Sequence, residues 1–161
     1  MTRRKTPPPA EPDALLIDPD KEDFSSARPL TRKQVQEMIR RKESLVEADL
    51  RGCDLAGMAF DGVDLSRAKF AEANLSRCTF KAATLVGGSF FGANLKDATL
   101  DEANLEDADF DYANLDGCSF RSAKIRKAIF PLRRVPLKDI QESVRSGRRV
   151  QMEALPLDED D

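Results

Sequence analysis

The side chains with the most reactive chemistry in this sequence are three cysteines, Cys53, Cys78 and Cys118. They lie far apart and form no CxxC or other metal-ligand spacing, and an odd number does not suit a disulfide framework. Histidine is absent, so the chain has no Cys-His or Ser-His nucleophile pair and no histidine metal ligand. We therefore predict that the cysteines are small core residues in a reducing compartment. We expect no catalytic residue, no metal site and no cofactor, and the protein is predicted not to be an enzyme.

Carboxylates are the other abundant functional group, and one block of twenty-one residues, 96–116, is strongly acidic. Only one base, Lys96, lies within it. A dense row of carboxylates can imitate the phosphates of a nucleic acid, so this acidic belt is a candidate site. The belt consists of Asp97, Asp101, Glu102, Glu106, Asp107, Asp109, Asp111 and Asp116.

A basic stretch follows the belt, with ten bases against two acids between Arg121 and Arg149. Direct nucleic-acid binding is disfavoured because the formal net charge of the chain is −3 and the stretch lacks interleaved aromatic residues. We expect a solvated or partner-facing surface instead. Its candidate residues, the basic patch, are Arg126, Lys127, Arg133, Arg134, Arg148 and Arg149.

A repeat with a period of five positions all of these residues. From Leu45 to Phe130, every fifth residue is Leu, Phe or Ile, over eighteen positions without an exception. Two residues before each centre runs a second register of mostly alanine, which includes all three cysteines. A period of five fits neither a helix nor a flat strand. It predicts a square coil in which four units make a turn of twenty residues and both registers point inward.

When residues twenty apart are aligned in columns, similar residue types fall in the same column, which supports this coil. One column reads Leu50, Phe70, Phe90, Phe110 and Phe130. The units AEANL, FGANL, DEANL and DYANL resemble the A(D/N)LXX signature of pentapeptide-repeat proteins. This resemblance implies an all-β solenoid, a right-handed quadrilateral β-helix of about four turns. It implies little about function, although some quinolone-resistance members of the family mimic DNA and bind gyrase.

The segments outside the repeat are predicted to serve as a flexible arm and as caps. Residues 1–29 form an arm rich in proline and charge, whose apolar cluster Leu15, Leu16 and Ile17 is either a docking motif or packs on the solenoid. Residues 30–44 carry a capping helix, with the repeat in 45–130. Residues 131–149 form a basic C-terminal cap with a short helix, or alternatively a homodimer contact, and residues 150–161 form an acidic tail.

An outward aromatic interrupts the repeat and is a candidate contact for a partner. Phe91 follows the centre Phe90 at a position that is otherwise polar, with Val86 before it and Tyr112 one turn further on. Either a partner protein binds Phe91, Tyr112 and Val86, or a terminal segment folds back and covers them.

These features predict a non-catalytic protein-protein interaction module, a scaffold or adaptor in the bacterial cytoplasm. Its partner is another protein, with no small-molecule substrate and no membrane, since no apolar run is long enough to span one. Residues 30–50 are similar to segments of type VI secretion accessory proteins. The alternative is a DNA mimic that binds a type II topoisomerase such as gyrase. Against it, the acidic belt circles one turn, and bases above and below are expected to pair with it.

Overall fold

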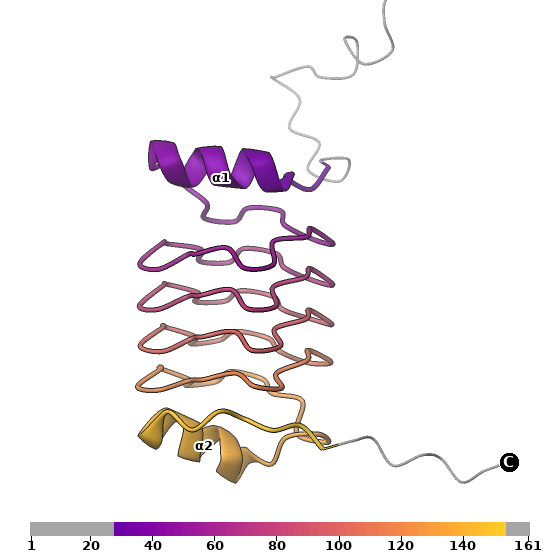
Figure 1. Cartoon of the computed structure of the whole chain (residues 1–161), viewed down its shortest axis with the longest axis vertical. Coiled ribbons are helices and arrows are strands. Elements are labelled where there is room, and N and C mark those ends of the chain that lie inside the picture. The colour runs from indigo at the N-terminus through magenta and orange to yellow at the C-terminus, as the bar shows by residue number, and fades with distance from the viewer. Residues whose placement is uncertain (1–27, 154–161) are drawn as a thin grey trace, which may run out of the picture.

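A computed structural model describes residues 28–153. It contains a stacked coil with a helix at each end, α1 (Arg32–Arg41) and α2 (Leu137–Ser146) (Figure 1). Within the coil, parallel β-bridges join residues that are twenty apart, from Asp49 with Lys69 to Asp109 with Ile129. Each five-residue unit contributes one such isolated bridge. Four units therefore make one turn of the coil, and residues twenty apart stack on one another.

Backbone hydrogen bonds explain why the unit has five residues. The N–H of Leu50 donates to the carbonyl of Lys69 in the next turn at 2.8 Å, and the N–H of Lys69 donates back to Ala48 at 2.9 Å. A tight turn follows, in which the Ala73 N–H donates to the Phe70 carbonyl at 2.9 Å. Its second central residue, Glu72, has a φ of 59°. Each unit is thus one bridged side and one corner.

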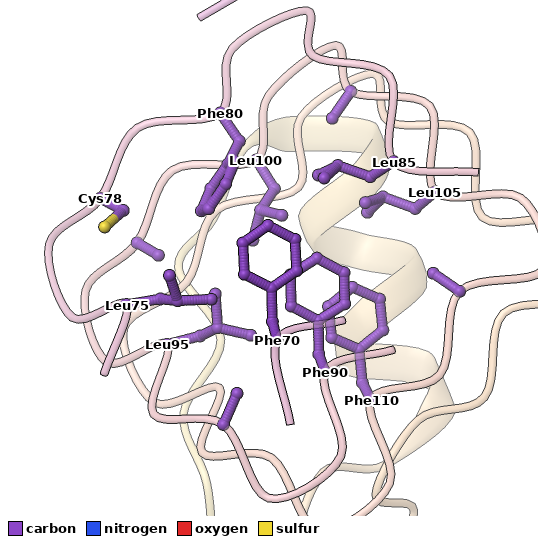
Figure 2. Packing of buried hydrophobic residues seen from close by; sticks show 14 of the residues in the cluster. Phe70, Leu75, Cys78, Phe80, Leu85, Phe90, Leu95, Leu100, Leu105 and Phe110 are labelled. Atoms are coloured by element: carbon purple, nitrogen blue, oxygen red, sulfur yellow. The ribbon is translucent and has the colours of Figure 1, made fainter. Parts of the chain in front are cut away.

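The core consists of the two inward registers. The centres from Leu45 to Phe120 are buried, and only Ile125 is partly exposed. The phenyl rings stack along the axis, with Phe90 at 4.8 Å from Phe70 and 4.7 Å from Phe110 between ring centroids (Figure 2). Such a ladder repeats the turn spacing of about 4.8 Å, so the aromatic rings reinforce the register of the backbone.

Helix α1 lies across the first turn (Figure 1). A capping box begins it, in which Thr31 Oγ1 accepts from the Gln34 N–H and Gln34 Oε1 accepts from the Thr31 N–H. Val35 is buried against the coil. Arg32 Nη1 donates to the Ala56 carbonyl at 3.0 Å, so it satisfies a first-turn acceptor that has no earlier turn to pair with.

The segment after the repeat lies against the last turn in a similar way. The buried Phe120 N–H would need a carbonyl from a further turn; it donates instead to Ser143 Oγ of α2 at 3.1 Å. The Ser122 N–H donates to the Val144 carbonyl at 2.8 Å. Ile140 is fully buried, so this part of the apolar side of α2 packs on the coil, whereas Leu137 at the start of α2 is 47% exposed. Within residues 28–153, no helix has the length and apolar character needed to cross a membrane.

Candidate interaction surface

Two large aromatic side chains project from one corner of the coil. Phe91 and Tyr112 follow the stacked centres Phe90 and Phe110 on successive turns, and they are 42% and 73% exposed. We call these two residues the apolar corner. The rings of Phe91 and Tyr112 lie 5.2 Å apart at 57°, so they already form a contact pair. Contiguous exposed apolar area of this kind marks interaction sites on soluble proteins.

The backbone of the corner explains why these side chains point outward. Phe91 and Tyr112 occupy the two central positions of corner turns, and both positions lie outside the inward registers. Tyr112 has a φ of 58°. The residue at the same position one turn earlier is Gly92, with a φ of 65°. A Cβ on Gly92 would lie 3.4 Å from Glu72 Cγ, whereas the Tyr112 ring packs against the Phe91 ring. The result is a shallow aromatic step on an otherwise polar edge.

The structure brings together two of the three predicted contact residues. Val86 is half-buried and belongs to the preceding corner, five residues away, so it is separated from Phe91 by one side of the coil. Sequence reasoning missed Leu132 and Ile129, which are also exposed. Leu132 lies outside the corner register, because it lacks the positive φ of the corners and the Pro131 carbonyl accepts from the N–H groups of Arg134 and Val135.

The acidic belt circles a single turn. Glu102 forms one ion pair with Lys81, at 4.0 Å, and Asp101 Oδ1 accepts from the Ser119 hydroxyl at 2.5 Å and from the Arg121 N–H at 2.9 Å. No other carboxylate of the belt forms an ion pair within residues 28–153, so most of the expected pairing with bases on neighbouring turns is absent there. Because an aspartate side chain is short, it forms a hydrogen bond with a backbone N–H of the next turn more readily than it reaches a flexible basic side chain of that turn.

Hydrogen bonds to backbone carbonyls distinguish two arginines of the basic patch from its other members. Arg149 Nη1 donates to the Gly117 carbonyl at 2.6 Å, and Arg134 Nε donates to the Glu153 carbonyl at 3.2 Å. These two side chains hold the end of the described chain against the last turn. The remaining members are exposed: Arg126, Lys127, Arg133 and Arg148.

The cysteines are held as protonated thiols. Burial raises the pKa of Cys78 to about 11, and burial also raises the pKa of Cys118. Each donates its S–H to a carbonyl of the previous turn, Cys78 to Leu55 at 3.0 Å and Cys118 to Leu95 at 2.9 Å. Thiolates are the reactive form of cysteine, so these side chains are poor nucleophiles. Residues 28–153 contain no cluster of three side chains suited to hold a metal ion.

Comparison with known proteins gives one family and several solved structures. Residues 53–130 match the model of the pentapeptide repeat region. No curated protein matches the chain. A pentapeptide repeat protein from the Arabidopsis thaliana thylakoid lumen is 34% identical with a TM-score of 0.49; the match covers 65% of this chain and 62% of that one.

Two further solved structures match parts of the chain. Rfr23, a pentapeptide repeat protein from the cyanobacterium Cyanothece 51142, is 27% identical with a TM-score of 0.45, covering 68% of this chain and 62% of its own. QnrB1, a plasmid-mediated fluoroquinolone resistance protein, is 16% identical with a TM-score of 0.28, covering 53% of this chain and 45% of its own. The chain therefore spans less than two thirds of the length of the Arabidopsis and Cyanothece proteins.

Proposed function

This chain belongs to the pentapeptide-repeat proteins through residues 53–130, and we propose that it is a non-catalytic protein-interaction module whose contact is the apolar corner. The observation that carries the proposal is the exposed pair of Phe91 and Tyr112. Aromatic side chains on a rigid backbone lose little entropy on binding, and such anchors dominate the energy of interfaces.

The rigidity of the coil supports this role. We propose a right-handed quadrilateral β-helix of about four turns in which α1 and α2 are caps. Arg32 at one end and Ser143 at the other satisfy backbone groups that a further turn would otherwise satisfy. A capped coil holds the corner in one geometry, which suits a scaffold or adaptor in the cytoplasm. The similarity of residues 30–50 to type VI secretion accessory proteins suggests a bacterial secretion component as the partner.

A DNA-mimic role is the alternative, and the acidic belt does not favour it. A mimic needs carboxylates that run along the axis over several turns. Here the belt occupies one turn, and bases such as Arg121, Lys124 and Arg126 follow on the next. If the purified protein inhibited supercoiling by gyrase at low micromolar concentration, the mimic would replace the interaction module as the function.

The direct test of the contact is cross-linking in native lysate followed by mass spectrometry. The wild-type chain is compared with Phe91→Glu, which places a charge in the apolar corner. The matched control is Lys96→Glu, because Lys96 is exposed and occupies the same turn position on the next corner. We expect Phe91→Glu to lose its partner and Lys96→Glu to keep it. Retention of every partner by Phe91→Glu would reject the contact.

A further inference from the structure

Helix α2 and the segment after it lie against the last turn of the coil (Figure 1). The Gly117 N–H donates to the Val150 carbonyl at 2.7 Å, and the Val150 N–H donates back to Cys118 at 2.8 Å, so this segment pairs with its side like a further strand. The next side is bonded to α2, because the Phe120 N–H donates to Ser143 Oγ at 3.1 Å. Along these two sides the chain itself replaces a further turn.

Every inner side of the coil presents the same backbone groups to the next turn. The Leu50 N–H donates to the Lys69 carbonyl at 2.8 Å, and the Lys69 N–H donates back to Ala48 at 2.9 Å. Two residues further on, the Gly52 N–H donates to the Ala71 carbonyl at 3.0 Å. A side therefore needs two acceptors and one donor, supplied by an extended segment that runs parallel to it.

The side at residues 123–127 belongs to the last turn and lacks these partners. By the same register, its donors are the N–H groups of Ile125 and Lys127, and its acceptor is the Ala123 carbonyl. None of the three groups has a hydrogen-bond partner within residues 28–153. Ile125 is also partly exposed, unlike the centres of the inner turns. We call residues 123–127 the open edge, since unpaired strand edges accept added strands.

The side chains of the open edge are basic. Lys124, Arg126 and Lys127 are exposed, and none forms an ion pair with another described residue. Glu106 and Asp107 occupy the same positions as Arg126 and Lys127 one turn earlier. The three bases therefore lie between these acids and any added strand, so an incoming segment with acidic side chains is favoured.

The register also fixes the order of side chains in such a segment. Lys124 already bridges Asn104 of the previous turn. A residue that accepts from Ile125 and donates to Ala123 would bridge Lys124 from the other side, with its side chain outward. The next residue would point inward over Ile125, and the one after it outward beside Arg126. An acid, an apolar residue and a second acid therefore match the open edge in charge and burial.

We propose that the open edge binds an extended segment of a partner protein with the order acid, apolar, acid, which joins the coil as a parallel strand. Backbone pairing supplies affinity, and the bases supply the preference for acids. A nucleic acid fits less well because it has no apolar side chain to cover Ile125. A second copy cannot continue the coil directly, since α1 lies across its first turn (Figure 1). The site is separate from the apolar corner and goes beyond the proposed function.

The probe is the peptide acetyl-Thr-Ala-Glu-Leu-Glu-Ser-amide, added to the full chain. Amide hydrogen exchange is followed by NMR with and without the peptide. At about 90% occupancy, we expect exchange of the Ile125 and Lys127 amides to slow about ten-fold, because it then proceeds only from the free tenth of the molecules. The Gly117 amide is already paired with Val150 and should not change.

Variants of the chain and of the peptide separate charge from backbone pairing. Lys124→Glu/Arg126→Glu should raise the Kd of the peptide about ten-fold or more. The matched control Arg77→Glu/Lys96→Glu changes the net charge equally on inner turns, where both bases are exposed, and should alter the Kd by less than about two-fold. A peptide N-methylated at its first Glu loses the donor to Ala123 and should bind about five-fold more weakly.

The other outcomes overturn the proposal. Absence of peptide binding at millimolar concentration would reject the site, and equal affinity of the N-methylated peptide would show adsorption by charge alone. Slow exchange at Ile125 and Lys127 without peptide would show that the edge is already paired. A second copy would be responsible if protection grew with protein concentration, and a segment outside residues 28–153 if it did not.

Two further controls separate the open edge from nucleic-acid binding and from the apolar corner. If a DNA duplex of about 20 base pairs bound more tightly than the peptide and Lys124→Glu/Arg126→Glu abolished this binding, the edge would be assigned to nucleic acid instead. Phe91→Glu should bind the peptide as the wild-type chain does, so loss of either contact is recognised without the other. Equal thermal melts of the variants will show that none of these readings comes from unfolding.

Discussion

Adjacent phenylalanines with opposite environments give the sharpest test of the packing. Phe90 is fully buried between the rings of Phe70 and Phe110, at 4.8 and 4.7 Å, and meets Phe80 edge-on at 6.4 Å. Phe91 is 42% exposed and contacts Tyr112. The same substitution to alanine should therefore have very different costs at neighbouring positions.

The magnitudes follow from burial and stacking. Phe90→Ala removes a buried ring and interrupts the ladder on both sides, which should lower the free energy of unfolding by about 4 kcal/mol. Phe90→Leu should cost only about 1.5 kcal/mol, because Leu50 already occupies the same column. Phe91→Ala loses one partly exposed contact and should cost under about 1 kcal/mol.

The assay is urea unfolding followed by far-ultraviolet circular dichroism, with all variants measured at one protein concentration. The free energy is extrapolated to water for each variant. The packing described here would be wrong if Phe90→Ala cost less than about 1.5 kcal/mol, or if Phe91→Ala cost as much as Phe90→Ala.

Three further predictions test the corners, the C-terminal end and the core thiols. Ala82 has a φ of 56°, so Ala82→Gly should stabilise the protein by up to about 1 kcal/mol, whereas Ala71→Gly should destabilise it by about 0.5 to 1 kcal/mol. Both changes in the free energy of unfolding are measured by urea unfolding. Changes of the same sign in the two variants would contradict the corner geometry. Ser143→Ala strands a buried backbone N–H and should cost about 1 to 3 kcal/mol in the same assay, while the exposed Ser146→Ala should cost much less. Burial raises the pKa of Cys118 above that of an unfolded thiol, so its contribution to stability is complete below the unfolded pKa of about 8.5 and is lost as pH rises above it. Cys118→Ala should therefore reduce the alkaline loss of stability measured by urea unfolding between pH 8 and 10, and an unchanged pH profile would contradict this.

The periodic part of the fold was readable from the sequence. A strict period of five, with two inward registers, predicts which residues are buried from Leu45 to Phe120 because each unit has only one way to turn both registers inward. The stacking of residues twenty apart followed from the same register, and the bridges have that spacing. Repetition made this possible, since one local solution is used throughout.

The candidate surface was only partly readable. Phe91 and Tyr112 are 21 residues apart, so the period of twenty places them on neighbouring turns. Val86 was predicted as part of the same contact, but it lies on the preceding corner, because five residues correspond to one whole side of the coil. Leu132 was missed because the chain leaves the corner register at Pro131, so the period of twenty does not place this residue.

The ends of the coil depend on contacts that no repeat encodes. Nothing in the sequence around Ser143 indicates that its hydroxyl accepts the Phe120 N–H, since the two lie 23 residues apart in unrelated segments. Asp101 likewise bonds to the Arg121 backbone, where charge alternation predicts an ion pair. In both cases side-chain reach and backbone demand determine the partner, and only the three-dimensional arrangement reveals them.

The most direct measurement of the central claim is the Kd of the partner recovered by cross-linking. It is measured by calorimetry with the wild-type chain, with Phe91→Ala and with the control Lys96→Ala. An aromatic anchor contributes about 2 kcal/mol or more, so Phe91→Ala should weaken binding roughly 30-fold or more while Lys96→Ala leaves it unchanged. An unchanged Kd for Phe91→Ala would contradict the account, because the apolar corner would then not be the contact.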